Sequence, residues 1–290
     1  TSFMPYYMEP LVRWNREGNG VIPNAATGWE VSEDAKTFTF HLLPGIKWSD
    51  GHPMTADDIM FWYEDILLNT DITPAIPVWL LDLEQVRKID AYTVEFTFNR
   101  PYLLFLEYIA FQTGGRPANL LIQPKHYLSQ FHPNYVTSDA LDQIVAAANY
   151  DSWALLFAQR QDYRLNPECP VIGAWMLETP GTRQILTRNP YYWKVDPAGH
   201  QLPYIDRVEV EVVLDPETIA LKVVAGELNF QFNRISLADF TLFRENEGPG
   251  NYRLRLWDTA LGSNLAFMPN LNHTDEALRE LFHSRDFRIA

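Results

Sequence analysis

The run from residue 37 to residue 68 constrains the fold more than any other part of the 290-residue sequence. Apolar and polar residues alternate over 37–42, which is the pattern of a strand with one buried face. Turns containing glycine and proline follow at 44–53, and the pattern then changes to a helical period with an apolar face made by Ile59, Trp62, Tyr63, Ile66 and Leu67. The fold of this chain must therefore contain both strands and helices.

Capping residues indicate where the helix in this run begins. Thr55 can cap its first turn, and Asp58 stands three residues later, where a capping box places an acidic or amide side chain. We therefore predict a helix over 56–68. The polar residues at 32–36, just ahead of the alternating segment, predict a hairpin turn.

The remaining sequence interleaves further strand-like and helix-like segments. The predicted strands are 86–90, 93–98, 182–188, 207–214 and 228–232. The predicted helices are 101–110, 139–158, 215–225 with Gly226 after its last turn, 236–245, and 274–281 capped by Thr274. The fold class is therefore α/β or α+β with a mixed sheet, and no strict strand–helix–strand repeat is present.

An excess of acidic residues limits the partners of this chain. It has 37 Asp and Glu against 23 Lys and Arg, a net charge of −14, and so lacks the basic surplus with which proteins bind nucleic acid. Its apolar runs are too short for a membrane span, and its one cysteine, Cys169, cannot build a disulfide framework. The sequence stops at Ala290 just after a helix start at Ser284, so we expect a fragment of a longer protein.

Sequence motifs with a known catalytic or metal-binding mechanism are absent. Glycine-rich phosphate loops and the HExxH, GxSxG and CxxC motifs do not occur. Asp57 and Asp58 fall in a first helical turn, where the helix dipole favours acidic side chains. His126 and His132 form the closest histidine pair, and we interpret them as loop or surface residues, with a ligand role as the alternative. We expect no catalysis, no metal and no cofactor.

Aromatic residues make up 14% of the chain, with nine Trp, 14 Tyr and 17 Phe. Such side chains bury large areas, and Trp and Tyr also carry a polar atom that suits a binding site. We expect most of them in the core and a minority in a wall that contacts ligand.

Residues 29–59 closely resemble a signature of the family 5 extracellular solute-binding proteins, the oligopeptide- and dipeptide-binding components of bacterial ABC importers. The order of family motifs continues along nearly the whole chain, at 123–128, 188–194, 203–208, 225–229 and 286–290. These motifs serve the scaffold, because Asp50-Gly51 makes a tight turn and Asn189-Pro190 ends a strand. They identify a fold without marking a site.

The resemblance implies a lobe of the periplasmic-binding-protein type II class, with a mixed sheet and an inserted subdomain. In that architecture lobe I consists of 1–48 and 171–257, the subdomain inserted into it is 49–170, and 258–290 is the hinge crossing and the start of a second lobe that is largely missing. Two lobes of such proteins close on a hinge around the ligand. The implied ligand is a peptide or an oligosaccharide, and the implied partner is a membrane permease. The protein would be a monomer in the periplasm or outside the cell, with a lipid anchor as one alternative.

Candidate ligand contacts follow from position in this architecture, at strand ends and loops that would face the cleft. They are Asn233 and Arg234 after the predicted strand at 228–232, Gly262, Ser263 and Asn264 at the hinge crossing, Trp79 after the first inserted helix, and Phe111, Gln112 and Thr113 before a Gly-Gly pair. The competing interpretation of each residue is a structural hinge or surface role. Arg234 would pair with an acidic ligand group or with a neighbouring Glu.

Two functions of other classes stay open at this stage. A secreted hydrolase would use a carboxylate pair, but the sequence shows acidic residues without a tuned arrangement. A sensor or chaperone-like module on the same fold would bind a protein partner. The aromatic content suits a peptide or a sugar equally. One cleft wall supplies only part of the contacts, so we expect the 290-residue chain to bind peptide weakly or not at all.

Overall fold

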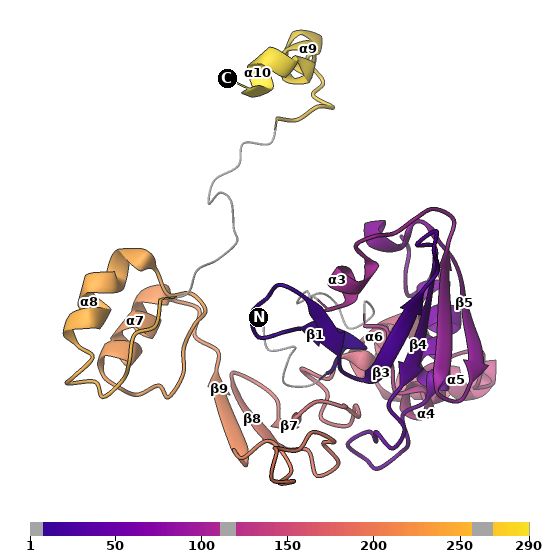
Figure 1. The fold of residues 1–290 in the computed structure, drawn as a ribbon, viewed down its shortest axis with the longest axis horizontal. Helices are drawn as coiled ribbons and strands as arrows, with labels where there is room; N and C mark the ends of the chain where they lie inside the picture. The colour runs from indigo at the N-terminus through magenta and orange to yellow at the C-terminus, as the bar shows by residue number, and fades with distance from the viewer. Residues whose placement is uncertain (1–7, 111–119, 257–268, 290) are drawn as a thin grey trace. The chain divides into compact units, whose positions relative to one another are not determined.

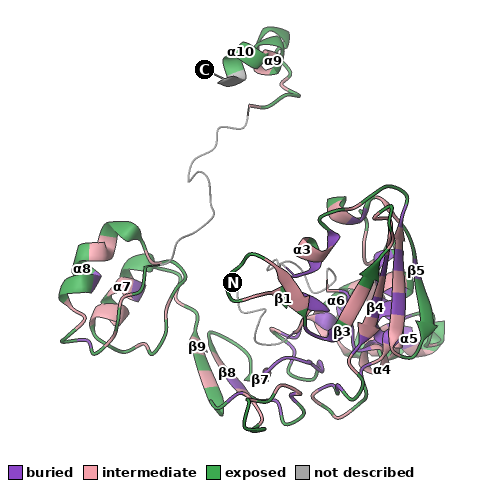
Figure 2. Ribbon diagram, in the orientation of Figure 1, coloured by how far each residue is buried: buried purple, intermediate pink, exposed green. Residues whose placement is uncertain are grey.

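The computed structural model describes residues 8–110, 120–256 and 269–289. The chain divides into two compact units, Thr1–Val212 and Val213–Ala290, and each is described by itself (Figure 1). Most of the buried apolar side chains belong to the first unit (Figure 2). Among the helices in the described ranges, none has the length and hydropathy of a membrane-spanning segment.

A four-stranded antiparallel sheet forms the centre of the first unit. Its strands lie in the order β3 (Ala26–Val31), β4 (Thr37–Leu42), β6 (Thr93–Phe98) and β5 (Leu83–Asp90). The predicted alternation in β4 is confirmed, because Phe38, Phe40 and Leu42 are buried and the residues between them are not. The predicted hairpin between β3 and β4 and the predicted strand pair at 86–98 are confirmed as well. The sheet draws strands from both sides of residue 48.

Two smaller sheets complete the strands of the first unit. A hairpin joins β1 (Val12–Trp14) to β2 (Val21–Pro23), and a three-stranded sheet has the order β7 (Trp175–Thr179), β8 (Arg183–Arg188) and β9 (Arg207–Glu211). The α/β class is confirmed. Every strand pair in the described part of the chain is antiparallel, however, which corrects the expected mixture of strand directions. Strands β1, β2 and β7 were not predicted.

Short helices pack around these sheets. They are α2 (Ala56–Phe61), the π-helix η1 (Trp62–Leu67), the 3-10 turn η2 (Val78–Leu80), α3 (Phe105–Ala110), α4 (Lys125–Leu128), the 3-10 turn η4 (Ser129–Phe131), α5 (Ser138–Ala147) and α6 (Trp153–Gln161). Helix α2 packs against β5 and β6, and α3 packs against β1. The helix predicted at 101–110 is confirmed only over its second half, and the one predicted at 139–158 is two helices.

The predicted helix over 56–68 is helical throughout but changes type in its middle. The capping box is confirmed, since the Thr55 side chain accepts a backbone hydrogen bond and the Asp58 side chain accepts one from the Thr55 backbone. After Phe61 the turns widen, and the Leu68 N–H donates to the carbonyl of Tyr63, five residues back. A π-segment of this kind inserts an extra residue into the helix.

The core of the first unit is aromatic. Phe105 of α3 lies at its centre, with its ring 5.0 Å from Phe38, 4.8 Å from Phe98 and 5.5 Å from Phe96. Most of the contacts in this cluster are edge-to-face, the geometry that adds an attractive quadrupole interaction to burial. The period-two runs of β4 and β6 therefore meet the apolar side of α3.

The second unit contains only helices and irregular segments in its described part. Its helices are α7 (Pro216–Val224), the 3-10 turn η5 (Leu237–Asp239), α8 (Phe240–Glu245), α9 (Glu276–His283) and α10 (Arg285–Ile289). Asp215 caps α7 as its N-cap. Gly226 follows α7 with φ +71°, and a Cβ there would lie 2.4 Å from the carbonyl oxygen of Gly250, so only glycine fits.

Two predictions about the second unit were wrong. The strand predicted over 228–232 does not form, and Phe230 and Phe232 are 71% and 56% exposed. A strand needs a partner for its backbone hydrogen bonds, and the described part of this unit contains no other strand. The cap of α9 is Asp275, one residue after the predicted Thr274, and its carboxylate accepts two backbone hydrogen bonds.

Candidate functional site

Trp79 is the predicted contact residue whose surroundings are most completely described. It lies in η2, half-buried against the core, and its ring stacks on the ring of Tyr108 from α3 with a centroid distance of 6.1 Å and an angle of 8°. Tyr102 contacts Tyr108 from a second direction, at 6.1 Å and 52°. We call Trp79, Tyr102 and Tyr108 the aromatic platform.

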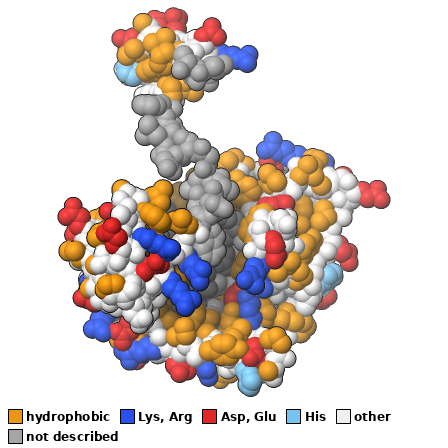
Figure 3. Space-filling model, turned by 60° about the vertical axis from the view of Figure 1, so that its left-hand side comes forward, with side chains coloured by type: hydrophobic (Ala, Val, Ile, Leu, Met, Phe, Trp, Pro, Cys, Tyr) orange, Lys and Arg blue, Asp and Glu red, His pale blue; other side chains and the backbone are white. Residues whose placement is uncertain are grey.

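Large apolar side chains around this platform are exposed. Tyr108 itself is 48% exposed, and the exposed residues near it in the sequence are Leu103 and Leu104 before α3, while Val78 and Leu81 begin and follow η2. Apolar side chains of this kind are visible elsewhere on the surface too (Figure 3).

Charged side chains lie at the edge of the platform. Asp82 follows η2 and forms an ion pair with Arg100, and the Asp82 carbonyl accepts a hydrogen bond of 2.9 Å from the Asn99 N–H. Burial, together with smaller effects of the neighbouring Tyr108 and Asp82, raises the pKa of Tyr102 to about 12. The surface thus combines an aromatic face with a polar edge, which is the composition of small-molecule sites.

The buried carboxylate of Asp58 holds the signature segment together. It accepts hydrogen bonds from the Thr55 N–H at 2.9 Å, the Lys125 N–H at 3.1 Å and the Trp48 indole at 3.3 Å. Burial raises the pKa of Asp58 to about 6, against the lowering effect of these three donors. Asp58 therefore does more than the predicted capping, because it also fastens α4 to the start of α2.

The turn at residue 51 is packed as the sequence predicts for a tight turn. Gly51 has φ +89°, and a Cβ there would lie 3.1 Å from the ring of Tyr191. Beside it, His126 Nε2 lies 2.7 Å from an Asp50 carboxylate oxygen, and the His52 and His126 rings stack at 4.0 Å. Burial lowers the pKa of His126 despite the opposing effect of Asp50. These contacts join two scaffold segments.

A second buried polar cluster centres on Asp65 in η1. Its carboxylate accepts hydrogen bonds from the Tyr135 hydroxyl at 2.6 Å and the Asn134 amide at 2.7 Å. His132, next to it, is fully buried, and burial lowers its pKa. His132 lies in a loop, as interpreted, but the surface alternative was wrong, because its ring packs among aromatic side chains of α2 and α6 that the sequence could not place near it.

A third cluster ties the N-terminal segment to the Asn-Pro-x-Tyr-Trp motif. Glu9 accepts hydrogen bonds from the Tyr192 hydroxyl at 2.6 Å, Lys194 at 2.6 Å and the Asn24 amide at 2.8 Å. Burial lowers the pKa of Lys194, against the effect of Glu9. As predicted, β8 ends before Asn189-Pro190. All three clusters support the scaffold rather than an open surface.

Asn233 and Arg234 lie together on the surface of the second unit. Arg234 has φ +55°, its guanidinium donates to the Leu214 carbonyl at 2.8 Å, and its backbone N–H donates to the Asn233 side chain at 3.0 Å. The guanidinium is thus held by backbone rather than by a neighbouring Glu. Both residues are exposed.

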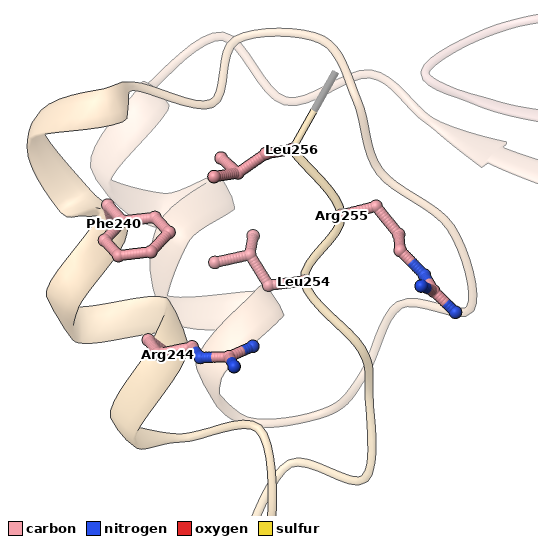
Figure 4. A pocket seen from close by; sticks show the side chains of 5 residues that line it. All are labelled: Phe240, Arg244, Leu254, Arg255 and Leu256. Atoms are coloured by element: carbon pink, nitrogen blue, oxygen red, sulfur yellow. The ribbon is translucent and has the colours of Figure 1, made fainter. Parts of the chain in front are cut away.

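The second unit also contains a shallow hollow of about 340 Å³ between α8 and the segment that precedes residue 257 (Figure 4). Its lining residues are Phe240, Arg244, Leu254, Arg255 and Leu256. Arg255 points away from α8, and Arg244 pairs with Glu247 at 2.8 Å. The hollow is open, and Arg244, one of its two arginines, is already paired.

Six predicted contact residues, Phe111, Gln112, Thr113, Gly262, Ser263 and Asn264, lie outside the described residues. The structure brings Asn233 and Arg234 together, and it places Trp79 beside Tyr108, which sequence reasoning missed. The signal for Tyr108 was weak, because a single Tyr in a short apolar helix is more often a core residue. Within residues 8–110, 120–256 and 269–289, no three His, Cys, Asp or Glu side chains are arranged to hold a metal ion.

Comparisons with known proteins give a consistent result. The sequence profile described as "Bacterial extracellular solute-binding proteins, family 5 Middle" matches residues 20–290. The periplasmic alpha-galactoside-binding protein of Rhizobium meliloti is 36% identical over 212 residues, which cover 70% of this chain and 27% of that protein.

Solved structures resemble the chain as well. The oligopeptide-binding protein OppA is 39% identical with a TM-score of 0.82, and the match covers 97% of this chain and 45% of that one. The periplasmic binding protein MelB from Agrobacterium fabrum, in complex with stachyose, is 30% identical with a TM-score of 0.66, over 84% of this chain and 35% of that one. The chain thus spans less than half the length of each of these relatives.

Proposed function

Because the chain belongs to the family 5 bacterial extracellular solute-binding proteins, we propose that it is part of the capture component of an ABC importer. In this proposal the protein encloses a peptide or an oligosaccharide between two lobes and delivers it unchanged to a membrane permease. It works in the periplasm or outside the cell, either free or held by a lipid anchor. It is a monomer that performs no catalysis.

The observation that carries this proposal is the likeness to OppA over 97% of the chain with a TM-score of 0.82. The family assignment rests on nearly the whole sequence, and the same segments that gave the sequence resemblance form the scaffold clusters around Asp58 and Glu9. Both ligand classes have support, since one relative is named for oligopeptides and two others for an alpha-galactoside and stachyose.

The same proposal assigns the cleft-facing residues. Trp79 would contact ligand from the inserted subdomain, and Asn233 and Arg234 would do so from the lobe. The division into 1–48, 49–170, 171–257 and 258–290 remains our proposal for the domain plan. The hinge residues Gly262, Ser263 and Asn264, and the wall at Phe111, Gln112 and Thr113, complete the proposed contact set.

Native mass spectrometry of the full-length protein purified without refolding tests the proposal, because the 290-residue chain spans less than half the length of its relatives. We expect a co-purified mass that matches a peptide or an oligosaccharide. Isothermal titration with stachyose and with a tripeptide mixture then identifies the class. A protein that binds neither ligand in either experiment contradicts the proposal.

A hydrolase is the rival function that deserves a direct assay. Incubation with a chromogenic glycoside or peptide should give no turnover. Turnover that disappears when a single Asp or Glu is replaced would establish catalysis instead. A sensor or chaperone-like module would be recognised by a protein that co-purifies in place of a small molecule.

A further inference from the structure

We propose that Asn19 is a site of spontaneous deamidation, at which the backbone nitrogen of Gly20 attacks the Asn19 side-chain amide and converts the residue into aspartate and isoaspartate. Asn19 is the only asparagine in the sequence that a glycine follows. It is exposed and lies in the turn that joins β1 to β2. The inference concerns the chain itself and is independent of the proposed function and of the ligand class.

The side-chain carbonyl of Asn19 is held in place by Asn15. The Asn15 side-chain oxygen accepts a hydrogen bond of 3.0 Å from the Asn19 backbone N–H. The amide nitrogen of Asn15 therefore faces the Asn19 side chain, and it donates to the side-chain oxygen at 2.7 Å. A donor at this oxygen stabilises the negative charge that the oxygen gains when its carbon is attacked. Asn15 is thus a positioning residue for the reaction.

The attacking nitrogen of Gly20 has no competing hydrogen bond. The turn is closed by the Asn15 N–H, which donates to the Gly20 carbonyl at 2.8 Å, and by the Gly18 N–H, which donates to the Asn15 carbonyl at 3.2 Å. None of the described residues accepts a hydrogen bond from the Gly20 N–H. Glycine also lacks a Cβ that would hinder the approach of its nitrogen to the preceding side chain. The two reacting groups are therefore available on adjacent residues.

Water is the only co-reactant that the conversion needs. The Gly20 nitrogen gives its proton to solvent and forms a bond to Cγ of Asn19, and the side-chain nitrogen takes up a proton and leaves as ammonia. Water then opens the resulting cyclic imide at either of its two carbonyl carbons. Opening at Cγ breaks the new bond and gives aspartate. Opening at the main-chain carbonyl gives isoaspartate, whose main chain runs through Cγ and is one methylene longer.

The Asp50-Gly51 turn has a related pair of residues, but both reacting groups there are engaged. The Gly51 N–H donates to the Trp48 carbonyl at 2.8 Å. The Asp50 carboxylate lies 2.7 Å from Nε2 of His126. An ionised carboxylate is also a poorer target for a nucleophile than a neutral amide. We therefore expect conversion at Asn19 and none at Asp50.

Isoaspartate formation should disturb the hairpin of β1 and β2. The added methylene lies inside the turn that the hydrogen bond from Asn15 to Gly20 closes. Val12 of β1 is fully buried, and α3 packs against this strand. The longer main chain therefore changes the register at the end of a hairpin that contributes to the core.

Peptide mapping by mass spectrometry after incubation at mildly alkaline pH tests the inference on the full-length protein. We expect conversion at Asn19, with isoaspartate detected by isoaspartyl methyltransferase labelling, and none at Asp50 in the same digest. Gly20→Ala places a Cβ 3.5 Å from the Asn15 amide nitrogen, an ordinary contact, and should slow the conversion about tenfold. Asn15→Asp keeps the oxygen that accepts the Asn19 N–H but loses the donor, and it should slow the conversion as well. Thermal unfolding confirms that both variants are folded.

Each result decides the inference. Isoaspartate at Asn19 in the wild type, with slower conversion in both variants, supports it. An Asn19 that stays unmodified overturns it, and so does a Gly20→Ala variant that reacts as fast as the wild type. Aspartate without isoaspartate also overturns it, because water would then have attacked the side chain directly. A rate that Asn15→Asp leaves unchanged overturns the positioning role of Asn15.

Discussion

Phe96 and Phe230 both stand in runs where apolar and polar residues alternate, yet Phe96 is fully buried and Phe230 is 71% exposed. The difference holds for the two units as a whole. The first unit buries a large cluster of aromatic and aliphatic side chains, whereas Ile219 and Phe243 are the buried apolar residues in the described part of the second. Alternation becomes a strand only where another strand lies beside it to accept its hydrogen bonds.

The two units also differ in where their hydrogen-bonded carboxylates lie. In the first unit Asp58 and Asp65 are buried and receive two or three donors each. In the second unit Asp215 caps a helix at the surface. A buried polar group that loses its hydrogen-bond partner has no water to replace it, and this costs free energy. An exposed group forms a hydrogen bond to water instead. Stability should therefore respond more strongly to changes in the first unit.

The largest effect should come from the pair of phenylalanines. Phe96→Ala removes a ring from the centre of the core and should lower the free energy of unfolding by about 3–5 kcal/mol. Phe230→Ala should change it by no more than about 0.5 kcal/mol, as an exposed substitution does. Urea unfolding followed by far-UV circular dichroism measures both. Equal losses would show that the second unit has an interior of its own.

Removal of the buried acceptor should have the next largest effect. Asp58→Ala leaves the Thr55 and Lys125 N–H groups and the Trp48 indole without their acceptor, and we expect a loss of about 3 kcal/mol in the same experiment. Asp215→Ala should cost less, because water replaces an exposed cap. Equal losses of stability in the two variants would show that burial does not determine how much each carboxylate contributes to the free energy of unfolding.

Two tyrosine hydroxyls give a smaller, closely matched pair. Tyr135 donates to the buried Asp65 carboxylate at 2.6 Å, and Tyr252 donates to the Phe243 carbonyl at 2.6 Å. Hydrogen bonds to charged groups are worth more, so we expect Tyr135→Phe to cost about 2 kcal/mol and Tyr252→Phe about 1 kcal/mol or less. Thermal unfolding of both variants should show the larger shift for Tyr135→Phe. The reverse order would mean that the Asp65 cluster is weakly coupled to folding.

A more gradual effect should appear as a pH dependence. Burial raises the pKa of Asp58 from 3.8 to about 6, so the folded state holds a proton that the unfolded chain releases in this range. The stability that the protonated form contributes is complete below about pH 3.8 and is lost as the pH rises through 6, by about 1.4 kcal/mol per pH unit at most.

Unfolding of the wild type and Asp58→Asn between pH 4 and 7 isolates this contribution. The stability difference, wild type minus variant, should decrease as the pH rises. His126 and His132 act in the opposite direction, because burial lowers their pKa values and acid then favours the unfolded chain. They contribute equally to both proteins and cancel in the difference. A difference that is constant with pH would place the Asp58 titration outside this range.

Much of the local structure could be predicted from the sequence. The strand at Thr37–Leu42, the capping box at Thr55 and the glycine after α7 each depend on residues within one turn or one strand. The predictions failed where the local structure depends on residues far away in the sequence. The strand expected at 228–232 has no neighbour, and the helix after Phe61 widens into a π-segment that buries Asp65 beside Asn134 and Tyr135.

The candidate site shows the same division. Trp79 could be selected by its place after the first inserted helix, but the ring that lies parallel to it belongs to Tyr108, 29 positions further along the chain. The ion pair of Asp82 and Arg100 likewise joins two segments on either side of a hairpin. Contacts of this kind depend on how strands pair, which a single sequence does not record.

By itself the sequence determined the elements, their order and the family, because periodicity, caps and turn residues act over a few positions and leave a readable pattern. Only the tertiary structure decided which runs pair with a neighbouring strand, which carboxylates lose contact with water, and which aromatic side chains stay exposed. Those outcomes depend on the packing of segments far apart in the chain, where one side chain gains or loses its neighbours through the arrangement of all the others.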